Sequence, residues 1–129
     1  MKKQHAIHNE KACDYLLLSK SFNEWVVTKA FYSALHYVQY ELFPVKQHNT
    51  TYKDFNTFFY RVLKRNNGTL NKHYATIRLV AQNLPACNPY YRWLHDAFKN
   101  ARYSNYRVSD KKAKTARVKL DLIKRHLNK

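Results

Sequence analysis

Apolar residues recur along most of the chain at the three- and four-residue spacing of an amphipathic α-helix. This pattern predicts six helical segments, at about residues 6–20, 22–43, 52–66, 70–84, 88–103 and 109–127. We find no internal repeat, low-complexity tract or linker between them. We therefore predict one domain over residues 1–129 with an all-α fold, a compact antiparallel bundle of five to six helices.

Residues that favour helix ends separate the predicted segments. Ser21-Phe22-Asn23-Glu24 has the form of a capping box, and Pro44 ends the helix that follows it. The stretch 45–50 is predicted to be a polar loop. Asn66-Asn67-Gly68 and Pro85 end the next two helices, whereas Asn88 before Pro89 and then Ser109 are predicted N-caps of the last two.

The segment 22–43 carries two stripes of large side chains. Its apolar face comprises Val27, Ala30, Phe31, Ala34, Leu35, Val38 and Leu42. The opposite face comprises Trp25, Lys29, Tyr32, His36 and Tyr40. A surface helix usually carries Lys, Glu and Gln on its outer side. We therefore expect this aromatic stripe to be covered by other helices, by a second copy of the chain or by a ligand.

Charge narrows the choice of partner. Lys and Arg total 24 against 8 Asp and Glu, a net charge of +16. Residues 65–129 hold 15 of the basic and 3 of the acidic residues. A polyanion bound mainly by the second half of the chain is the expected partner. An AT-rich genome that favours Lys and Asn codons is an alternative explanation, although eight arginines argue against it.

Other features of the composition restrict the class of protein. The chain has one Gly and three Pro, which leaves little material for the turns and bulges of a sheet. Cys13 and Cys87 have no metal-ligand spacing and are expected to be packed thiols in a reducing cytoplasm. The sequence contains no apolar run long enough to cross a membrane and begins with no signal segment. We expect a cytoplasmic protein without metal or other cofactor and without a membrane partner.

The nucleic-acid contacts are predicted around the fifth helix and the chain that follows it. Guanidinium groups can pair with phosphates, and tyrosines can stack on bases. The residues expected to make these contacts are His95, Lys99, Arg102, Tyr106, Arg107, Lys111 and Lys114. For each lysine of the last helix, a solvated face that keeps the protein soluble explains the charge equally well.

A series of short motifs along residues 8–125 resembles the HEPN superfamily. The series comprises His8-Asn9-Glu10-Lys11-Ala12, Asp14-Tyr15-Leu16, Glu24-Trp25, the stretch from Phe31 to Val38, a loop His48, Tyr91 to Leu94, and Ala101-Arg102-Tyr103. The resemblance implies an antiparallel helical bundle that commonly forms homodimers. It also implies a place among prokaryotic toxins and antiviral defence systems, many of which cut RNA without metal.

Active members of that superfamily carry an Arg, four to six residues, and then a His. Arg102 matches the Arg, but the positions for the His hold Arg107, Val108 and Ser109. Another group must then move protons at the 2′-hydroxyl and the leaving oxygen. His36 is our first candidate because it lies on the aromatic stripe. Tyr103, Tyr106, His48 and His95 are further candidates. Alternatively, His36 is a hydrogen-bonded packing residue and His48 is a solvated loop residue.

Three hypotheses follow from the sequence. The protein is a metal-independent endoribonuclease or toxin that uses Arg102, His36 and Tyr103. Alternatively it binds RNA without cutting it, as part of a defence complex. The third hypothesis is a helical adaptor whose aromatic stripe docks a protein partner or a ribonucleoprotein.

Overall fold

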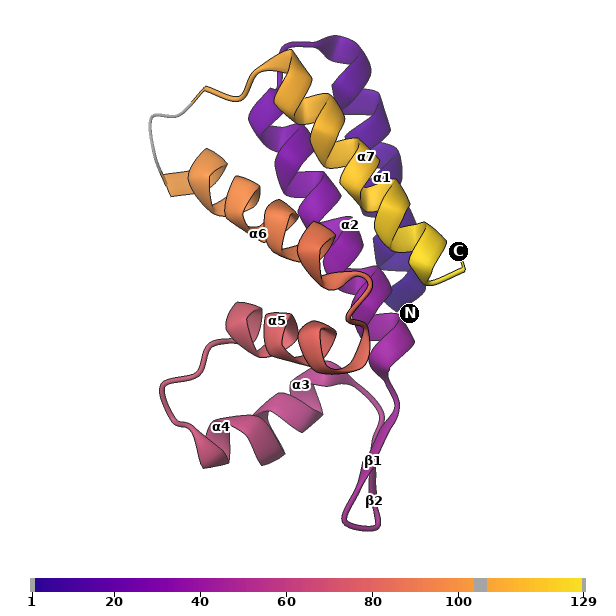
Figure 1. The fold of residues 1–129 in the computed structure, drawn as a ribbon, viewed down its shortest axis with the longest axis vertical. Helices are drawn as coiled ribbons and strands as arrows, with labels where there is room; N and C mark the ends of the chain where they lie inside the picture. The colour runs from indigo at the N-terminus through magenta and orange to yellow at the C-terminus, as the bar shows by residue number, and fades with distance from the viewer. Residues whose placement is uncertain (1, 104–106, 129) are drawn as a thin grey trace.

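The computed structural model describes residues 2–103 and 107–128. Six helical stretches account for most of this part of the chain (Figure 1). In chain order they are α1 (Lys2–Ser19), α2 (Asn23–Leu42), a continuous stretch of α3 (Phe55–Phe58), the π-helix η1 (Phe59–Leu63) and α4 (Lys64–Asn66), then α5 (Lys72–Asn83), α6 (Asn88–Tyr103) and α7 (Asp110–His126). Within the described ranges, the strands β1 (Val45–Gln47) and β2 (Thr50–Tyr52) form the only sheet. The predicted all-α fold of five to six helices is confirmed.

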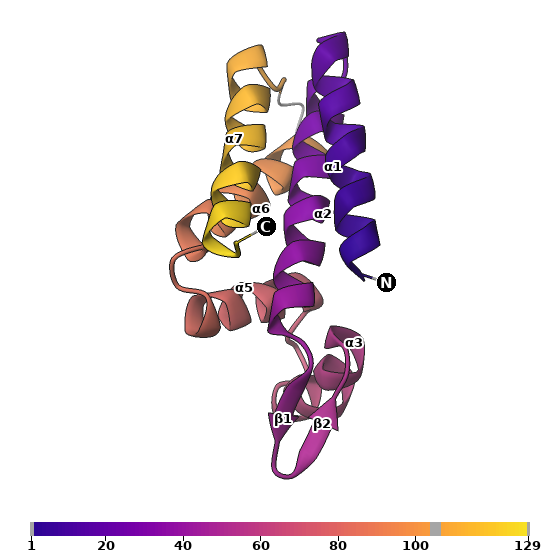
Figure 2. The same cartoon turned by 90° about the vertical axis from the view of Figure 1, so that its right-hand side faces the viewer.

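The main core lies between four long helices. Helices α1, α2 and α7 run side by side along the long axis, and α6 packs against α2 and α7 (Figures 1 and 2). Phe31 of α2 is fully buried near the middle of this core, where its ring stacks on Phe98 of α6 with centroids 4.6 Å apart. The apolar residues that recur by three and four in the predicted segment 109–127 form a buried seam of α7, at Ala113, Ala116, Leu120, Ile123 and Leu127.

A second, smaller core lies below the end of α2. Phe43, Phe55, Phe58, Phe59 and Ala75 form it, and they come from the segment after α2, from the helical stretch that begins with α3, and from α5. Leu42 at the end of α2 packs against both cores. Helix α5 consequently lies between the main bundle and the α3–α4 stretch, which is the arrangement seen in Figure 1.

Three predicted helix boundaries are confirmed. Helix α2 ends two residues before Pro44, α4 ends at Asn66, and α5 ends two residues before Pro85. Ser109 is the N-cap of α7, because its hydroxyl oxygen accepts a hydrogen bond of 3.0 Å from the Lys112 amide. Asn88 was predicted to be the N-cap of α6, but it is the first residue of the helix, which therefore begins one residue earlier than the cap implies.

The predicted capping box at the start of α2 is wrong. Phe22 occupies the N-cap position and no side chain caps the helix there. The Ser21 hydroxyl donates to the carbonyl oxygen of Ser19 instead. Asn23 donates to the carbonyl oxygen of Val108 and to Asp110, at 3.0 and 2.8 Å, so its amide joins the start of α2 to the start of α7.

The prediction of a polar loop at 45–50 is also wrong, because these residues belong to a β-hairpin. Val45 pairs with Tyr52 and Gln47 with Thr50 in an antiparallel ladder. His48 and Asn49 form the two-residue turn with φ of 51° and 64°. Positive φ at both central residues is what a tight hairpin turn needs, and Asn tolerates it well.

A network of charged residues holds α1 against α7. The Arg117 guanidinium lies 2.7 Å from Glu10 and 2.8 Å from Asp121, and it also pairs with Asp14. Glu10 accepts further hydrogen bonds of 2.7 Å from Lys124 and from the Tyr37 hydroxyl. Three of the eight acidic residues of the chain are therefore gathered on one side of the bundle.

None of the helices described is both long and apolar enough to span a membrane.

Candidate nucleic-acid interface

A cleft of about 450 Å³ opens where α2, α5, α3 and the start of α1 meet. We call it the histidine cleft, because three imidazoles line it. Its lining residues are His5, Tyr32, Leu35, His36, Gln39, Phe55, Asn56, Lys72, His73 and Thr76. Tyr32 and His36 belong to the aromatic stripe predicted on α2, and both are half-buried. The structure therefore shows that this part of the stripe lines a cavity.

Helix caps fix the residues that α5 and α3 contribute to the cleft. The Asn71 side chain accepts a hydrogen bond of 2.9 Å from the Tyr74 amide, so Lys72 and His73 lie in the first turn of α5. Asp54 caps α3 in the same way, through a bond of 2.8 Å from the Thr57 amide. The cap places Phe55 and the adjacent Asn56 at the start of α3.

Imidazole rings meet in two pairs at the cleft. The rings of His5 and His36 are 5.3 Å apart edge to face, and those of His73 and His95 are 5.7 Å apart. His73 also contacts Phe31 and Phe98, at 5.4 and 5.8 Å between centroids. Its Nδ1 atom is buried and has no hydrogen-bond partner within the described residues.

Both members of the second pair stay uncharged at neutral pH. Burial lowers the pKa of His73 below its usual 6.5, and the charges of His95 and Arg102 lower it further. Burial also lowers the pKa of His95; the carboxylate of Asp96 opposes this shift, whereas Lys99 adds to it. A neutral imidazole can accept a proton, so His73 has the form that a general base needs.

A side pocket of about 230 Å³ adjoins the cleft and shares His73 with it. Asn71, Tyr74, His95, Phe98 and Lys99 line the rest of this side pocket. Tyr74 is 46% exposed, and Lys99 donates a hydrogen bond of 3.4 Å to its hydroxyl. Tyr74 recurs with Leu70 and Ile77 at helical spacing, which predicts that it lies on the apolar face of the segment 70–84. This prediction is wrong, because Ala75, Thr76 and Val80 make the buried face of α5.

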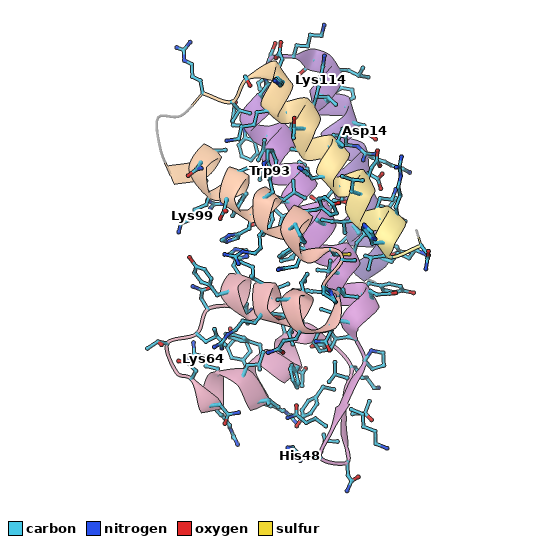
Figure 3. All side chains as sticks on the ribbon, viewed as in Figure 1. Asp14, His48, Lys64, Trp93, Lys99 and Lys114 are labelled. Atoms are coloured by element: carbon cyan, nitrogen blue, oxygen red, sulfur yellow. The ribbon has the colours of Figure 1, made fainter. Side chains whose placement is uncertain are left out.

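Lysines and tyrosines continue the rim of the cleft along one edge of the molecule. Lys72 lies 5.0 Å from the centre of the Tyr60 ring, and Lys64 lies 6.0 Å from it. Tyr60 is 54% exposed. Figure 3 shows Lys64 and Lys99 on the same edge of the molecule, whereas Asp14 of the Arg117 network lies on the opposite edge. No Asp or Glu is among the residues that line the cleft and its side pocket.

Arg102 lies near the cleft but lines a different cavity from His36. It is exposed, with its guanidinium 5.8 Å from the Phe98 ring centre, and it lines a pocket with Glu24, Trp25, Thr28 and Ala101. Trp25 is 53% exposed there, so this end of the aromatic stripe remains uncovered. The charge of Arg102 nevertheless lowers the pKa of His73, which lines the cleft.

The other predicted site residues are dispersed. His95 is only 6% exposed and lines the side pocket with Lys99. Lys111 and Lys114 line a separate shallow pocket on α7, and Arg107 is exposed before that helix. Lys29 and Tyr40 are half-buried on α2, and His48 is exposed at the far end of the hairpin (Figure 3). The Tyr103 side chain and Tyr106 lie outside the described part of the protein.

Six polar residues of the cleft were not predicted as site residues: His5, Gln39, Asn56, Lys72, His73 and Thr76. The spacing of His73, Thr76 and Val80 by three and four residues was the available signal for a buried face that includes an imidazole. Nothing in the sequence places His5 beside His36, because the contact joins two helices.

Among the described residues, no group of three or more His, Cys, Asp or Glu side chains could hold a metal ion.

Comparison with family models, with curated proteins and with solved structures gives no match to this chain. The resemblance to the HEPN superfamily depends on the sequence motifs alone.

Proposed function

We propose that this protein binds RNA through the histidine cleft and its rim. The observation that carries the proposal is a cleft and side pocket whose described lining residues include no Asp or Glu. They are edged by lysines and exposed tyrosines, in a chain of net charge +16. Lysines supply the contacts to phosphate that dominate RNA affinity, and exposed aromatic rings supply stacking surfaces for bases. The resemblance to the HEPN superfamily favours RNA as the polyanion and a role in prokaryotic defence or as a toxin in the cytoplasm.

A comparison of two charge-reversed variants tests where the RNA binds. Lys72→Glu with Lys99→Glu changes the rim of the cleft and side pocket, whereas Lys111→Glu with Lys114→Glu makes the same change of charge on α7. We expect the rim variant to lose about a hundredfold in affinity for a labelled single-stranded RNA and the α7 variant less than about fivefold. Fluorescence anisotropy at fixed salt measures both. Equal losses, or a larger loss in the α7 variant, would contradict the proposed site.

A second candidate function is cleavage of the bound RNA without metal. The observation in its favour is that His5, His36 and His73 line one cleft. Neutral His73 takes the proton of a ribose 2′-hydroxyl, the 2′-oxygen attacks phosphorus, and the bond from phosphorus to the 5′-oxygen breaks. Protonated His36 returns a proton to that 5′-oxygen, which leaves a 2′,3′-cyclic phosphate and a 5′-hydroxyl. Lys72 stabilises the charge on the phosphorane.

Incubation of RNA with the protein in EDTA tests for cleavage. We expect cyclic phosphate ends, their loss in His73→Ala and in His36→Ala, and a smaller loss in Arg102→Ala because Arg102 lines another pocket. RNA that stays bound and intact would leave the protein as a binding module only.

The homodimer predicted from the sequence has a candidate surface at the corner between α1 and α2. Tyr15, Leu18, Phe22 and Trp25 are 48–82% exposed there. Large apolar side chains gathered at the surface commonly mark protein interfaces. We propose that a second copy covers this corner, and sedimentation of Leu18→Ser should then show a monomer. An adaptor that docks a different protein at the corner is the alternative, in which case the wild-type chain alone sediments as a monomer.

A further inference from the structure

Gln39 forms part of the wall of the histidine cleft. The residue is 6% exposed, and its Nε2 atom donates one long hydrogen bond of 3.4 Å to the Thr76 hydroxyl. Thr76 in turn donates its hydroxyl hydrogen to the carbonyl oxygen of Lys72 at 3.0 Å. Because the Thr76 hydrogen is used in that bond, the group that faces Thr76 must be the amide nitrogen of Gln39 and not its oxygen.

This orientation leaves hydrogen-bonding capacity at the wall of the cleft. A glutamine amide has two donor hydrogens and one acceptor oxygen. Within the described part of the chain, Gln39 uses one hydrogen, and its Oε1 and second hydrogen have no protein partner. Oε1 does not belong to the buried side-chain atoms that lack a hydrogen-bond partner, so it is open to the cleft. Polar atoms of this kind pair with water or with a ligand. An adjacent acceptor and donor at the wall of an open cleft can therefore bind a ligand with the complementary edge.

The size and the walls of the cleft restrict that ligand. The cleft of about 450 Å³ lies within the ~300–1,000 Å³ of small-ligand pockets. Tyr32, Leu35 and Phe55 give it apolar and aromatic walls, and His36 adds an imidazole face. Lys72 contributes a basic side chain to the lining. A flat heteroaromatic group with a polar edge, attached to an anion, matches these features.

We propose that the histidine cleft takes one unpaired nucleobase of the bound RNA. The edge of the base pairs with Oε1 and Nε2 of Gln39, as glutamine pairs with adenine in other protein–nucleic acid contacts. The base lies among Tyr32, His36 and Phe55, and Lys72 binds the adjoining phosphate. This inference rests on the proposed RNA binding and adds that the RNA is read as a single strand.

Duplex RNA should bind less tightly for a physical reason. A base inside a duplex is stacked and paired, and taking it out costs a few kcal/mol. A single strand offers its bases without that cost. The rim lysines, by contrast, act on either form through phosphate charge.

Mononucleotides test the base contact on the unmodified protein. In ¹H–¹⁵N spectra, we expect adenosine monophosphate to shift the side-chain amide resonances of Gln39, and ribose 5-phosphate, which lacks the base, to leave them in place. The exposed Gln82 of α5 serves as an internal reference. Equal responses to the two compounds, or none at Gln39, would overturn the proposal.

A matched pair of variants carries the test to RNA. At constant salt, a single-stranded 12-nucleotide adenosine RNA should bind at least about tenfold more tightly than a 12-base-pair RNA duplex. Gln39→Met should lose about tenfold in affinity for the single strand, whereas Gln82→Met should lose none. Circular dichroism checks that Gln39→Met keeps the fold. If this variant unfolds, the mononucleotide spectra of the unmodified protein decide whether the cleft binds a base.

The outcomes separate this inference from the proposed function. Salt-dependent binding of single strand and duplex with equal affinity would overturn the base pocket and leave RNA binding in place. Absence of binding to either RNA would overturn both.

Discussion

The imidazoles of this protein differ in what their surroundings let them do. His73 and His95 are held neutral in a partly buried pair, whereas His48 is exposed at the hairpin turn. A histidine whose pKa is lowered by folding binds fewer protons in the folded state than in the unfolded state as pH falls below 6.5. The two buried imidazoles therefore make stability depend on pH.

We expect the free energy of unfolding to fall as the pH is lowered from about 6.5 through the lowered folded pKa values of His73 and His95. Above the unfolded pKa of 6.5, the stability that comes from packing these two imidazoles in their neutral form is fully present. Urea unfolding at pH 7.5, 6.5 and 5.5 measures the change. In a plot of the free energy of unfolding against pH, His95→Gln should reduce the slope. The same change at the exposed His8 should leave the slope as in the wild type. A wild-type profile that is flat over this range would contradict the effect.

Glu10 is the carboxylate on which the α1–α7 contact depends. Burial raises the pKa of Glu10, but hydrogen bonds from Lys124 and Tyr37 and the charges of Lys124 and Arg117 outweigh this, so the pKa lies below 4.5. We expect Glu10→Gln to lower the free energy of unfolding by about 2 kcal/mol, because it leaves Arg117 and Lys124 with a neutral partner. Urea unfolding measures the loss. The stability of the wild type should fall below pH 4.5 as Glu10 becomes protonated, and the variant should lose this part of the pH dependence.

At the scale of the helix, capping residues decide which side chains reach the cleft. Asn71 caps α5, which carries Lys72 and His73 in its first turn, and Ser109 caps α7, which lies apart from the cleft. Substituting either cap with Ala should cost about 1 kcal/mol of stability.

Only the Asn71→Ala variant should weaken RNA binding, since it loosens the turn that carries Lys72. We expect a loss of at least about threefold in affinity for Asn71→Ala and none for Ser109→Ala, measured by anisotropy at equal degrees of folding. Equal affinities in the two variants would contradict this role of α5.

The sequence predicted most of the elements, because amphipathic spacing and caps are local. Ser109 and the buried seam of α7 are examples, and Cys13 and Cys87 are buried and free, as expected. The predictions that failed involve contacts between residues that are far apart in the sequence. Asn23 binds residues 85 and 87 positions away, and this contact accompanies an end of α2 that no side chain caps. The histidine cleft combines three separate helices with α1, and no single stretch of sequence contains that arrangement.

At the scale of the whole molecule, the net charge of +16 should act in opposite directions on the two proposed partners. Salt weakens RNA binding because the release of counterions from the RNA is less favourable at higher salt concentration. The logarithm of affinity should therefore fall linearly with the logarithm of salt concentration. Salt should strengthen the proposed homodimer, because it screens repulsion between two cationic copies. Anisotropy and sedimentation between 50 and 300 mM salt measure the two trends. A dimer that dissociates as salt rises would contradict the apolar corner as its contact.

The Arg117 network has a consequence for how the molecule meets its ligand. By holding Glu10, Asp14 and Asp121 against Arg117 on the α1–α7 side, it keeps three carboxylates away from the edge that carries Lys64 and Lys99 (Figure 3). A carboxylate beside those lysines would weaken the positive potential that a polyanion meets before contact. The edge with Lys64 and Lys99 should therefore attract the strand during diffusion without repulsion from these three groups.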